Sequence, residues 1–268
     1  MRSIHAIAAF ALLTAATGAA FSSTATAETY AWRASGAAGI ATSDTLAGRI
    51  PPPPGFERVP SGEGSFAAWL RGLPMKPVGS PVLLFTGASK ARQDVHTAVV
   101  DIDVGKRDLQ QCADGIMRLR AEWLWSLGRA RDIAFNDTDG KRRTFASTGK
   151  SDHASFRKYM DLVFAYAGTY SLDRELKAVS PMDITIGDVF IKGGFPGHAV
   201  VVADVARNAS GEVRFLLLQS YMPAQEIHVL KNPASPDGSP WYATPVAFPF
   251  VTPEWVFPAG SLKRFPKD

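Results

Sequence analysis

The chain has 268 residues, of which 46% are hydrophobic and 20% charged, and its formal net charge is +4. These values are typical of a globular protein with a sizeable core. The mild basic excess, with no Lys/Arg block longer than Lys141-Arg142-Arg143, does not indicate nucleic-acid binding. The single cysteine, Cys112, excludes an internal disulfide.

The first 27 residues have the pattern of a secretory signal peptide. Arg2 supplies a positive charge, residues 7–13 are apolar, and Ala25-Thr26-Ala27 forms an A-x-A cleavage site. We therefore expect residues 1–27 to be removed and the mature protein to be periplasmic or secreted. No later run approaches the roughly 18 apolar residues of a membrane helix, so we do not expect the mature chain to span a membrane.

This pattern gives a first testable prediction, a mature N-terminus at Glu28. Mass spectrometry of the protein purified from its native host measures the processed end directly. A chain that still begins at Met1 would contradict the prediction.

The first part of the mature chain is expected to be irregular, and the first regular elements follow it. Residues 28–60 are predicted to form an extended arm, because four consecutive prolines at 51–54 favour polyproline II. A short helix is expected over 64–70, with Ser65 as its cap and Gly72 as its stop. Strands are expected at 82–85 and 97–104.

The strongest helix pattern begins at Asp108 and ends at Gly128. Asp108 and Gln111 have the spacing of a capping box. Four residues then share one face at helical spacing: Cys112, Ile116, Leu119 and Trp123. Arg118 and Glu122 lie four residues apart, which fits either a solvated face or a buried ion pair.

The second half is predicted to begin with a hairpin and helices and to continue as a sheet. The hairpin joins 132–135 to 142–146 across an Asp-Gly turn, which lacks the full spacing of a calcium loop. A long helix is expected at 152–167. A further short helix is expected to be capped by Ser171 and to end at Val179. Four strands follow, at 185–192, 198–206, 213–219 and 225–230. Residues 232–268 are rich in proline and predict a tail wrapped on the surface, so that 28–268 form a single α+β domain.

Three residues are candidates for chemistry, and each has a structural alternative. Cys112 lies near a helix start, where the helix dipole favours a thiolate, but it is equally consistent with a buried cysteine. His198 begins a buried strand and can act as a general base, or it is a satisfied core histidine. Gln219 ends an apolar strand, where it can orient an imidazole or bond the adjacent turn.

The remaining histidines are weaker candidates. His228 alternates with apolar residues and is expected to point outward, whereas His153 lies in a helix start and His96 at a strand start. No histidine pair has metal-ligand spacing, and no glycine-rich loop has the phosphate-binding pattern. We therefore expect neither a metal nor a cofactor.

Residues 108–122, 187–205 and 217–225 carry a resemblance to an exported bacterial family defined as a domain of unknown function, over nearly all of the mature chain. More distantly, the chain is similar to the NlpC-type papain-like cell-wall peptidases. In those proteins, a cysteine on a helix precedes a Gly-Asp strand, a histidine and a polar third residue. Here that order is met by Cys112, Gly187-Asp188, His198 and Gln219.

The second resemblance implies a fold and a function. The fold is a papain-like antiparallel sheet packed against a nucleophile-bearing helix, with extended N- and C-terminal segments. The function is an exported cysteine hydrolase, an amidase or peptidase with Cys112, His198 and Gln219 as its catalytic residues. Its partner would be peptidoglycan or another cell-envelope peptide. The alternative is a non-catalytic periplasmic binding or envelope-associated protein with a buried Cys112. The sequence predicts neither the bond cleaved nor the oligomeric state.

Overall fold

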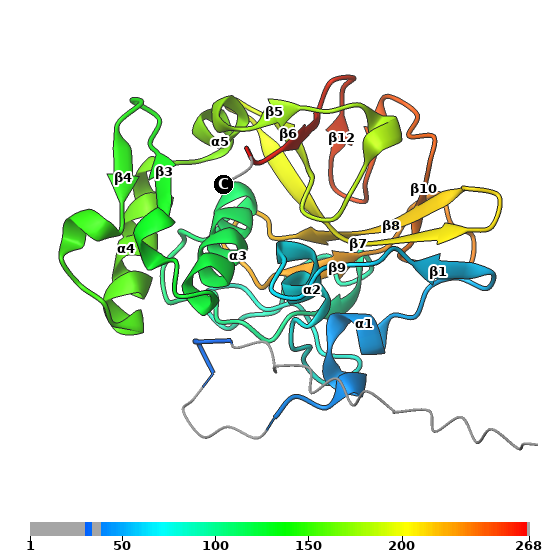
Figure 1. The fold of residues 1–268 in the computed structure, drawn as a ribbon, viewed down its shortest axis with the longest axis horizontal. Coiled ribbons are helices and arrows are strands. Elements are labelled where there is room, and N and C mark those ends of the chain that lie inside the picture. Colours follow the sequence, from blue (N-terminus) through cyan, green and yellow to red (C-terminus); the bar gives the residue numbers. More distant parts are fainter. Residues whose placement is uncertain (1–29, 34–38, 267–268) are drawn as a thin grey trace, which may run out of the picture.

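The computed structural model describes residues 30–33 and 39–266. The expected signal peptide and part of the arm lie outside these residues. The architecture is mixed α/β, with a helical side that carries α3, α4 and α5 and a sheet side built on a large antiparallel sheet (Figure 1). The first helices, α1 (Leu46–Arg49) and α2 (Phe66–Arg71), lie beside the sheet.

The main sheet has nine strands, and their described pairings are antiparallel. Along its path the strands are β2 (His96–Val99), β9 (His228–Leu230), β8 (Val213–Gln219), β7 (His198–Asn208), β6 (Val189–Lys192), β13 (Leu262–Arg264) and β5 (Lys177–Ala178). In addition, β1 (Phe56–Arg58) pairs with β7, and β10 (Tyr242–Ala243) pairs with β8. The four strands predicted between 185 and 230 correspond to β6–β9. The predicted strand at 82–85 forms isolated bridges only.

The long strand β7 lies at the centre of the sheet. Its residues 198–206 are all buried, because strands flank it on both sides and helices cover it. The run of valines and alanines there suits such a site, since β-branched side chains fill a pleated surface and no charge has to be desolvated at most positions. The exception is Asp204, which is paired with Arg58 at 2.6 Å and Arg71 at 2.7 Å.

The helices mostly begin where their caps predict. The hydroxyl of Ser65 accepts from the Ala68 amide at 3.1 Å to begin α2, and Asp152 accepts from Ser155 at 2.8 Å to begin α4 (His153–Tyr166). The prediction for α5 (Thr169–Glu175) was wrong at both ends. Gly168 precedes this helix, and the Ser171 hydroxyl lies inside it, where it accepts from the Gly168 amide at 3.1 Å.

The helix α3 (Cys112–Ser126) begins four residues later than its sequence pattern predicts. The capping pair is Gln111 with Asp114, whose Oδ2 accepts from the Gln111 amide at 3.0 Å. Asp108 instead accepts from the Ala224 amide at 2.7 Å, which ties the segment before α3 to the loop after β8. Cys112 is therefore the first residue of the helix, where the helix dipole acts most strongly on a thiol.

Helix α3 packs against β7 and is buried along most of its length. A Cβ at Gly115 would lie 3.1 Å from the Ser220 side chain and 3.5 Å from that of Ile227, so glycine lets the helix approach the sheet closely. The expected apolar face is buried, and the Arg118–Glu122 pair is a fully buried ion pair with a distance of 2.7 Å.

Leu119 tests this packing. Its side chain is 1% exposed, so Leu119→Ala is expected to lower the free energy of unfolding by about 2–5 kcal/mol. Urea denaturation followed by tryptophan fluorescence measures the change. A loss below about 0.5 kcal/mol, typical of surface sites, would mean that the face of α3 is misassigned.

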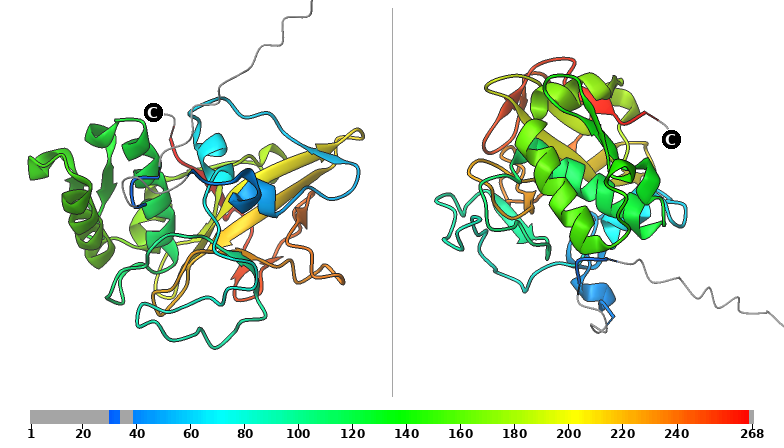
Figure 2. Two further views of the ribbon diagram at one scale, coloured as in Figure 1. Left: turned by 90° about the horizontal axis from the view of Figure 1, so that it is seen from below. Right: turned by 90° about the vertical axis from the view of Figure 1, so that its left-hand side faces the viewer.

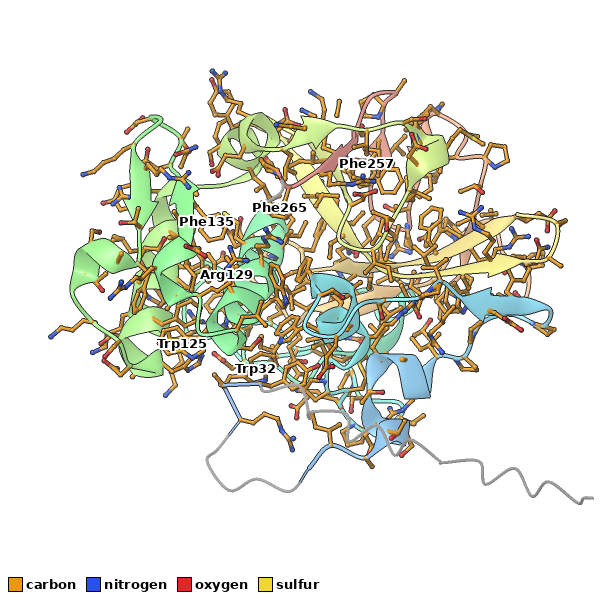
Figure 3. The ribbon with its side chains drawn as sticks, viewed as in Figure 1. Trp32, Trp125, Arg129, Phe135, Phe257 and Phe265 are labelled. Atoms are coloured by element: carbon orange, nitrogen blue, oxygen red, sulfur yellow. The ribbon has the colours of Figure 1, made fainter. Side chains whose placement is uncertain are left out.

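The two ends of the domain are more regular than predicted. The arm contains α1 and β1, and the tail contains β10, β11 (Phe250–Val251), β12 (Val256–Phe257) and β13. Strand β13 inserts between β6 and β5. The tail, orange to red in Figure 2, runs along the sheet side of the domain. Phe257, labelled in Figure 3, is buried, and its ring lies 6.0 Å from that of Phe190. The prolines limit these strands to two or three residues, but such short pieces still complete the sheet and the core.

Among the described residues, no helix combines the length and the apolar character needed to cross a membrane.

Candidate functional site

The turn between β6 and β7 positions His198. His198 is the first residue of β7 and pairs with Lys192. Gly197 precedes it, and a Cβ there would lie 2.3 Å from Thr169 Oγ1 and 2.6 Å from the Lys192 carbonyl oxygen. Only glycine fits this position, because the neighbouring backbone cannot move away. The turn is therefore packed tightly against the start of α5, and this packing fixes the backbone position of His198.

Three buried side chains form a hydrogen-bonded chain that ends at His198. Lys90 Nζ lies 2.6 Å from Glu254 Oε1, and Gln219 Nε2 donates to Glu254 Oε2 at 2.7 Å. Gln219 Oε1 then lies 2.9 Å from His198 Nε2. A carboxylate only accepts hydrogen bonds, so Glu254 requires the amide nitrogen of Gln219 to face it. The amide oxygen consequently faces the imidazole.

This orientation determines the tautomer of His198. Because Gln219 presents an oxygen, His198 Nε2 carries the proton and Nδ1 carries the lone pair. Nδ1 is buried and has no hydrogen-bond partner in the described part of the chain. Burial lowers the pKa of His198 to about 4, so the ring is neutral at pH 7 and Nδ1 is free to accept a proton.

His228 supports the same amide from the other side. Its Nδ1 donates to the Glu226 carbonyl oxygen at 2.8 Å, so its Nε2 is an acceptor, 3.4 Å from Gln219 Nε2. The expectation that His228 points outward was wrong: its side chain is fully buried, and burial lowers its pKa to about 3. Alternation misled here because both faces of β9 are covered, so that His228 and its neighbour Val229 are buried on opposite faces.

Aromatic rings surround the His198 imidazole. The ring centroid of Tyr221 lies 4.9 Å away, that of Trp255 5.3 Å and that of Phe257 5.8 Å. They shield the ring from water, which disfavours the imidazolium and accounts for the lowered pKa. Two of these three rings come from the C-terminal tail.

Cys112 lies in the same region as His198. The backbone of Ala199, the residue after His198, lies close enough to the Cys112 sulfur to favour its thiolate. Burial and the neighbouring charge of Asp114 act more strongly in the opposite sense and raise the pKa of Cys112 to about 12. The structure thus joins His198 to Gln219 and places the Cys112 sulfur beside the backbone of the next residue, Ala199. His198 is hydrogen-bonded to Gln219, but its Nδ1 has no hydrogen bond to the Cys112 sulfur.

Cys112 lines a pocket of about 480 Å³ between the helical and sheet sides. The walls come from the start of α3, the α4–α5 junction, the β6–β7 turn and Met222. At the rim, Phe195 is 81% exposed, and its ring is stacked 6.2 Å from that of Tyr170. Exposed aromatic rings beside a pocket offer an apolar contact surface to a bound molecule.

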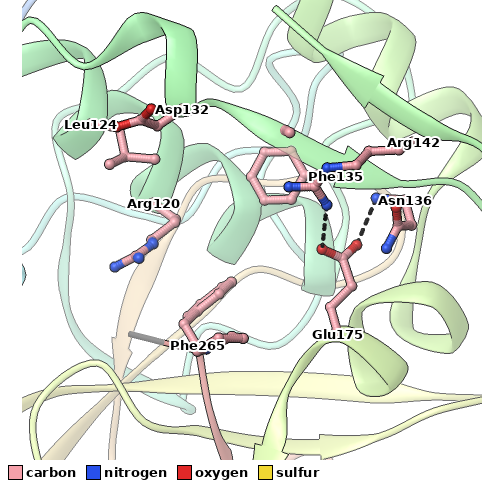
Figure 4. A pocket seen from close by; sticks show the side chains of 10 residues that line it. Arg120, Leu124, Asp132, Phe135, Asn136, Arg142, Glu175 and Phe265 are labelled. Atoms are coloured by element: carbon pink, nitrogen blue, oxygen red, sulfur yellow. Dashed lines mark hydrogen bonds and ion pairs between the residues drawn. The ribbon is translucent and has the colours of Figure 1, made fainter. Parts of the chain in front are cut away.

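A second pocket, of about 290 Å³, lies on the helical side (Figure 4). Of its two carboxylates, Asp132 is paired with Arg129 at 2.7 Å, and Glu175 accepts from the Asn136 amide at 2.6 Å and lies 4.0 Å from Arg142. Arg120 stacks over the ring of Phe265 at 4.9 Å. These charged groups already have partners, and neither cysteine nor histidine lines this pocket. The thiol pocket is therefore the stronger candidate.

The sequence analysis missed Lys90, Glu254 and Asp114 as parts of the site. Lys90 and Glu254 are 164 residues apart and lie in segments without long regular elements, so no periodic pattern marks them. Asp114 had a signal, because it follows Gln111 at capping-box spacing. In the described ranges, no cluster of three or more His, Cys, Asp or Glu side chains could hold a metal. The Asp137 turn is a simple hairpin turn between β3 (Ala134–Asn136) and β4 (Arg142–Thr144).

The buried histidines predict a pH-dependent stability. Below pH 6.5 the unfolded chain binds protons at His198 and His228, but the folded protein does not until about pH 4 and about pH 3. The free energy of unfolding should therefore fall on acidification from pH 6.5, by up to about 1.4 kcal/mol per pH unit for each histidine.

Urea denaturation at pH 7, 6 and 5 measures this slope. Several buried carboxyl groups, including Asp114 and Asp188, have raised pKa values and act in the opposite sense, so the informative quantity is a difference. His228→Leu should have a smaller acid slope than the wild type. Equal slopes would show that His228 does not titrate as its burial implies.

The fold and the site define a mixed α/β protein with a thiol that lines a pocket and an oriented, neutral imidazole buried at the start of β7. The family model described as domain of unknown function (4846) matches residues 46–150 and 144–264. The chain belongs to this family. No curated protein and no solved structure matches it, and none of these comparisons links it to the NlpC-type peptidases.

Proposed function

We propose that the protein is a cysteine hydrolase that cleaves an amide bond. One observation carries the proposal: Glu254 and Gln219 orient His198 so that its Nδ1 lone pair is free, and the backbone of the next residue, Ala199, lies beside the sulfur of Cys112, the one cysteine of the chain. A nucleophile, a base and a third group that orients the base are the parts that thiol hydrolysis needs.

In the proposed reaction, Cys112 attacks the amide carbonyl while His198 Nδ1 accepts the thiol proton. Gln219 Oε1 stabilises the imidazolium through Nε2–H, and the negative charge of Glu254 strengthens this contact. The backbone N–H groups at the start of α3 stabilise the oxyanion. Nδ1–H then protonates the leaving amine, and water, deprotonated by the same nitrogen, hydrolyses the thioester.

The free protein holds this pair neutral. The pKa of Cys112 is raised to about 12 and that of His198 lowered to about 4, so the proton stays on sulfur until substrate binds. Proton transfer is therefore coupled to attack, as in a serine hydrolase, and does not precede it.

The same values favour a second candidate, a non-catalytic binding protein. A buried, 7% exposed cysteine with a raised pKa behaves as an inert apolar side chain. In that case the pocket binds a ligand, and the hydrogen-bonded series of side chains that links Lys90 through Glu254 and Gln219 to His198 is purely structural.

The setting of the reaction is a further part of the proposal. The signal-like segment at residues 1–27 supports export, and the resemblance to NlpC-type peptidases supports a papain-like scaffold and a peptidoglycan stem peptide or similar amide as substrate. The large antiparallel sheet, with α3 packed on its central strand, is compatible with that scaffold.

The test is hydrolysis followed by mass spectrometry. Purified protein is incubated with soluble stem peptides released from peptidoglycan, and the products are examined for a new amine and carboxyl end. Acid quenching in mid-reaction traps a thioester as a mass increase on Cys112. Products and adduct in the wild type, both absent in Cys112→Ala, support the hydrolase. Saturable binding of the peptides without products favours the binding protein.

A further inference from the structure

Asp114 is a buried carboxyl group in the wall of the thiol pocket. It is 5% exposed and lies two residues after Cys112 in the first turn of α3. Its Oδ2 accepts from the Gln111 amide at 3.0 Å. Its Oδ1 is buried and has no hydrogen-bond partner within residues 30–33 and 39–266. The helix cap thus uses one carboxyl oxygen and leaves the other available.

The pocket around Asp114 is acidic. Its charged lining residues are Asp108 and Asp114, and its described lining includes neither lysine nor arginine, although the whole chain is basic. The nearby His198 is neutral, and Lys90 is paired with Glu254. Burial raises the pKa of Asp114 well above its usual range, because the carboxylate has no counter-ion there, and a cation in the pocket would favour the ionised form. A second anion would be repelled.

From this arrangement we infer that Asp114 is the recognition group for a primary ammonium on the ligand of the thiol pocket. The inference deepens the proposed function and rests on it for the substrate class: an amide that carries a primary ammonium close to the bond cleaved. A free N-terminus and an amino side chain share this chemistry. The ammonium would donate to Oδ1, while Oδ2 keeps its bond to Gln111.

The same contact would activate the nucleophile. When Asp114 is ionised, its negative charge raises the pKa of Cys112, and a bound ammonium offsets that charge. At a pH where Asp114 is ionised, a cationic substrate would therefore favour the thiolate more than a neutral substrate does.

The test measures binding to Cys112→Ala, which cannot hydrolyse the probe. Calorimetry compares trialanine amide, which has a free N-terminal ammonium, with its N-acetyl form. It also compares N-acetylated tripeptide amides that contain central lysine or norleucine. At least one ammonium probe should bind about tenfold more tightly than its neutral match, as a charge-assisted hydrogen bond allows.

Asp114→Asn, added to Cys112→Ala, should abolish this preference while its amide oxygen keeps the helix cap. Asp108→Asn is the matched control, because Asp108 lines the same pocket but already accepts from the Ala224 amide. It should retain most of the preference. In a protein that retains Cys112, Asp114→Asn should also speed the alkylation of the Cys112 thiol by iodoacetamide at pH 8. An unchanged melting temperature of this variant shows that its fold is intact.

Equal affinity for ammonium and neutral probes, or a preference that survives Asp114→Asn, would overturn the inference. That result would leave the proposed hydrolase intact, because the hydrolase is tested separately by product formation in the wild type. A preference that depends on Asp114, without hydrolysis by the wild type, would refute the proposed hydrolase and retain the ammonium site.

Discussion

Cys112→Ala is expected to abolish amide hydrolysis, and His198→Ala to lower kcat/KM by roughly 10²–10⁴-fold, the usual contribution of a general base. Cys112 supplies the only thiol, so no other sulfur can form the thioester. Alanine is well tolerated in a helix, so the first variant should keep its fold. Rates with a cleaved stem peptide and far-ultraviolet circular dichroism check both expectations.

His96→Ala is the matched control. His96 is half-buried and hydrogen-bonds to the Ser80 carbonyl oxygen at 3.2 Å. It does not belong to the hydrogen-bonded series that joins Lys90, Glu254, Gln219 and His198. The His96→Ala variant should retain near wild-type kcat/KM. Full activity in folded Cys112→Ala would refute the hydrolase mechanism. Equal losses of kcat/KM in His96→Ala and His198→Ala would show that the loss comes from a disturbed structure and not from a missing base.

The largest expected effect on stability is at the buried ion pair inside α3. Arg118 and Glu122 are both fully buried, and Arg118 also lies 3.1 Å from Asp103 and 3.2 Å from Gln110 Oε1. Arg118→Met leaves the Glu122 carboxylate buried without its arginine. The free energy of unfolding should fall by about 3–5 kcal/mol, as for other broken buried pairs. Urea denaturation at pH 7 measures it.

A double variant separates the pair from the packing. Arg118→Met with Glu122→Leu removes both charges and should recover most of the loss, because no isolated charge remains. Arg107→Met removes an exposed partner of Asp161 and should cost less than about 1 kcal/mol. A similar small cost for Arg118→Met would mean that His153, whose Nε2 lies 3.0 Å from Glu122 Oε2, is a sufficient partner for the carboxylate.

The elements that could be predicted from the sequence are those whose signals are local. Ser65 and Asp152 begin their helices because each side chain caps the backbone amide three residues later. The valine run of β7 marks a buried strand by itself, and the Asp-Gly pair marks the β3–β4 turn. Local chemistry also placed Cys112 near a helix start and His198 at the start of a strand.

Chain segments far apart in the sequence decided the rest. Asp108 bonds the Ala224 amide instead of capping α3, so the helix begins at Cys112. Glu254, from a proline-rich tail, orients Gln219 and through it the tautomer of His198. His228 is likewise buried because other parts of the chain cover both faces of β9. The candidate residues and the local elements could be predicted from the sequence, because caps, turns and periodicity act over a few residues. The free ring nitrogen of His198 and the unpartnered carboxyl oxygen of Asp114 could not, because hydrogen bonding and desolvation depend on neighbours from the whole folded chain.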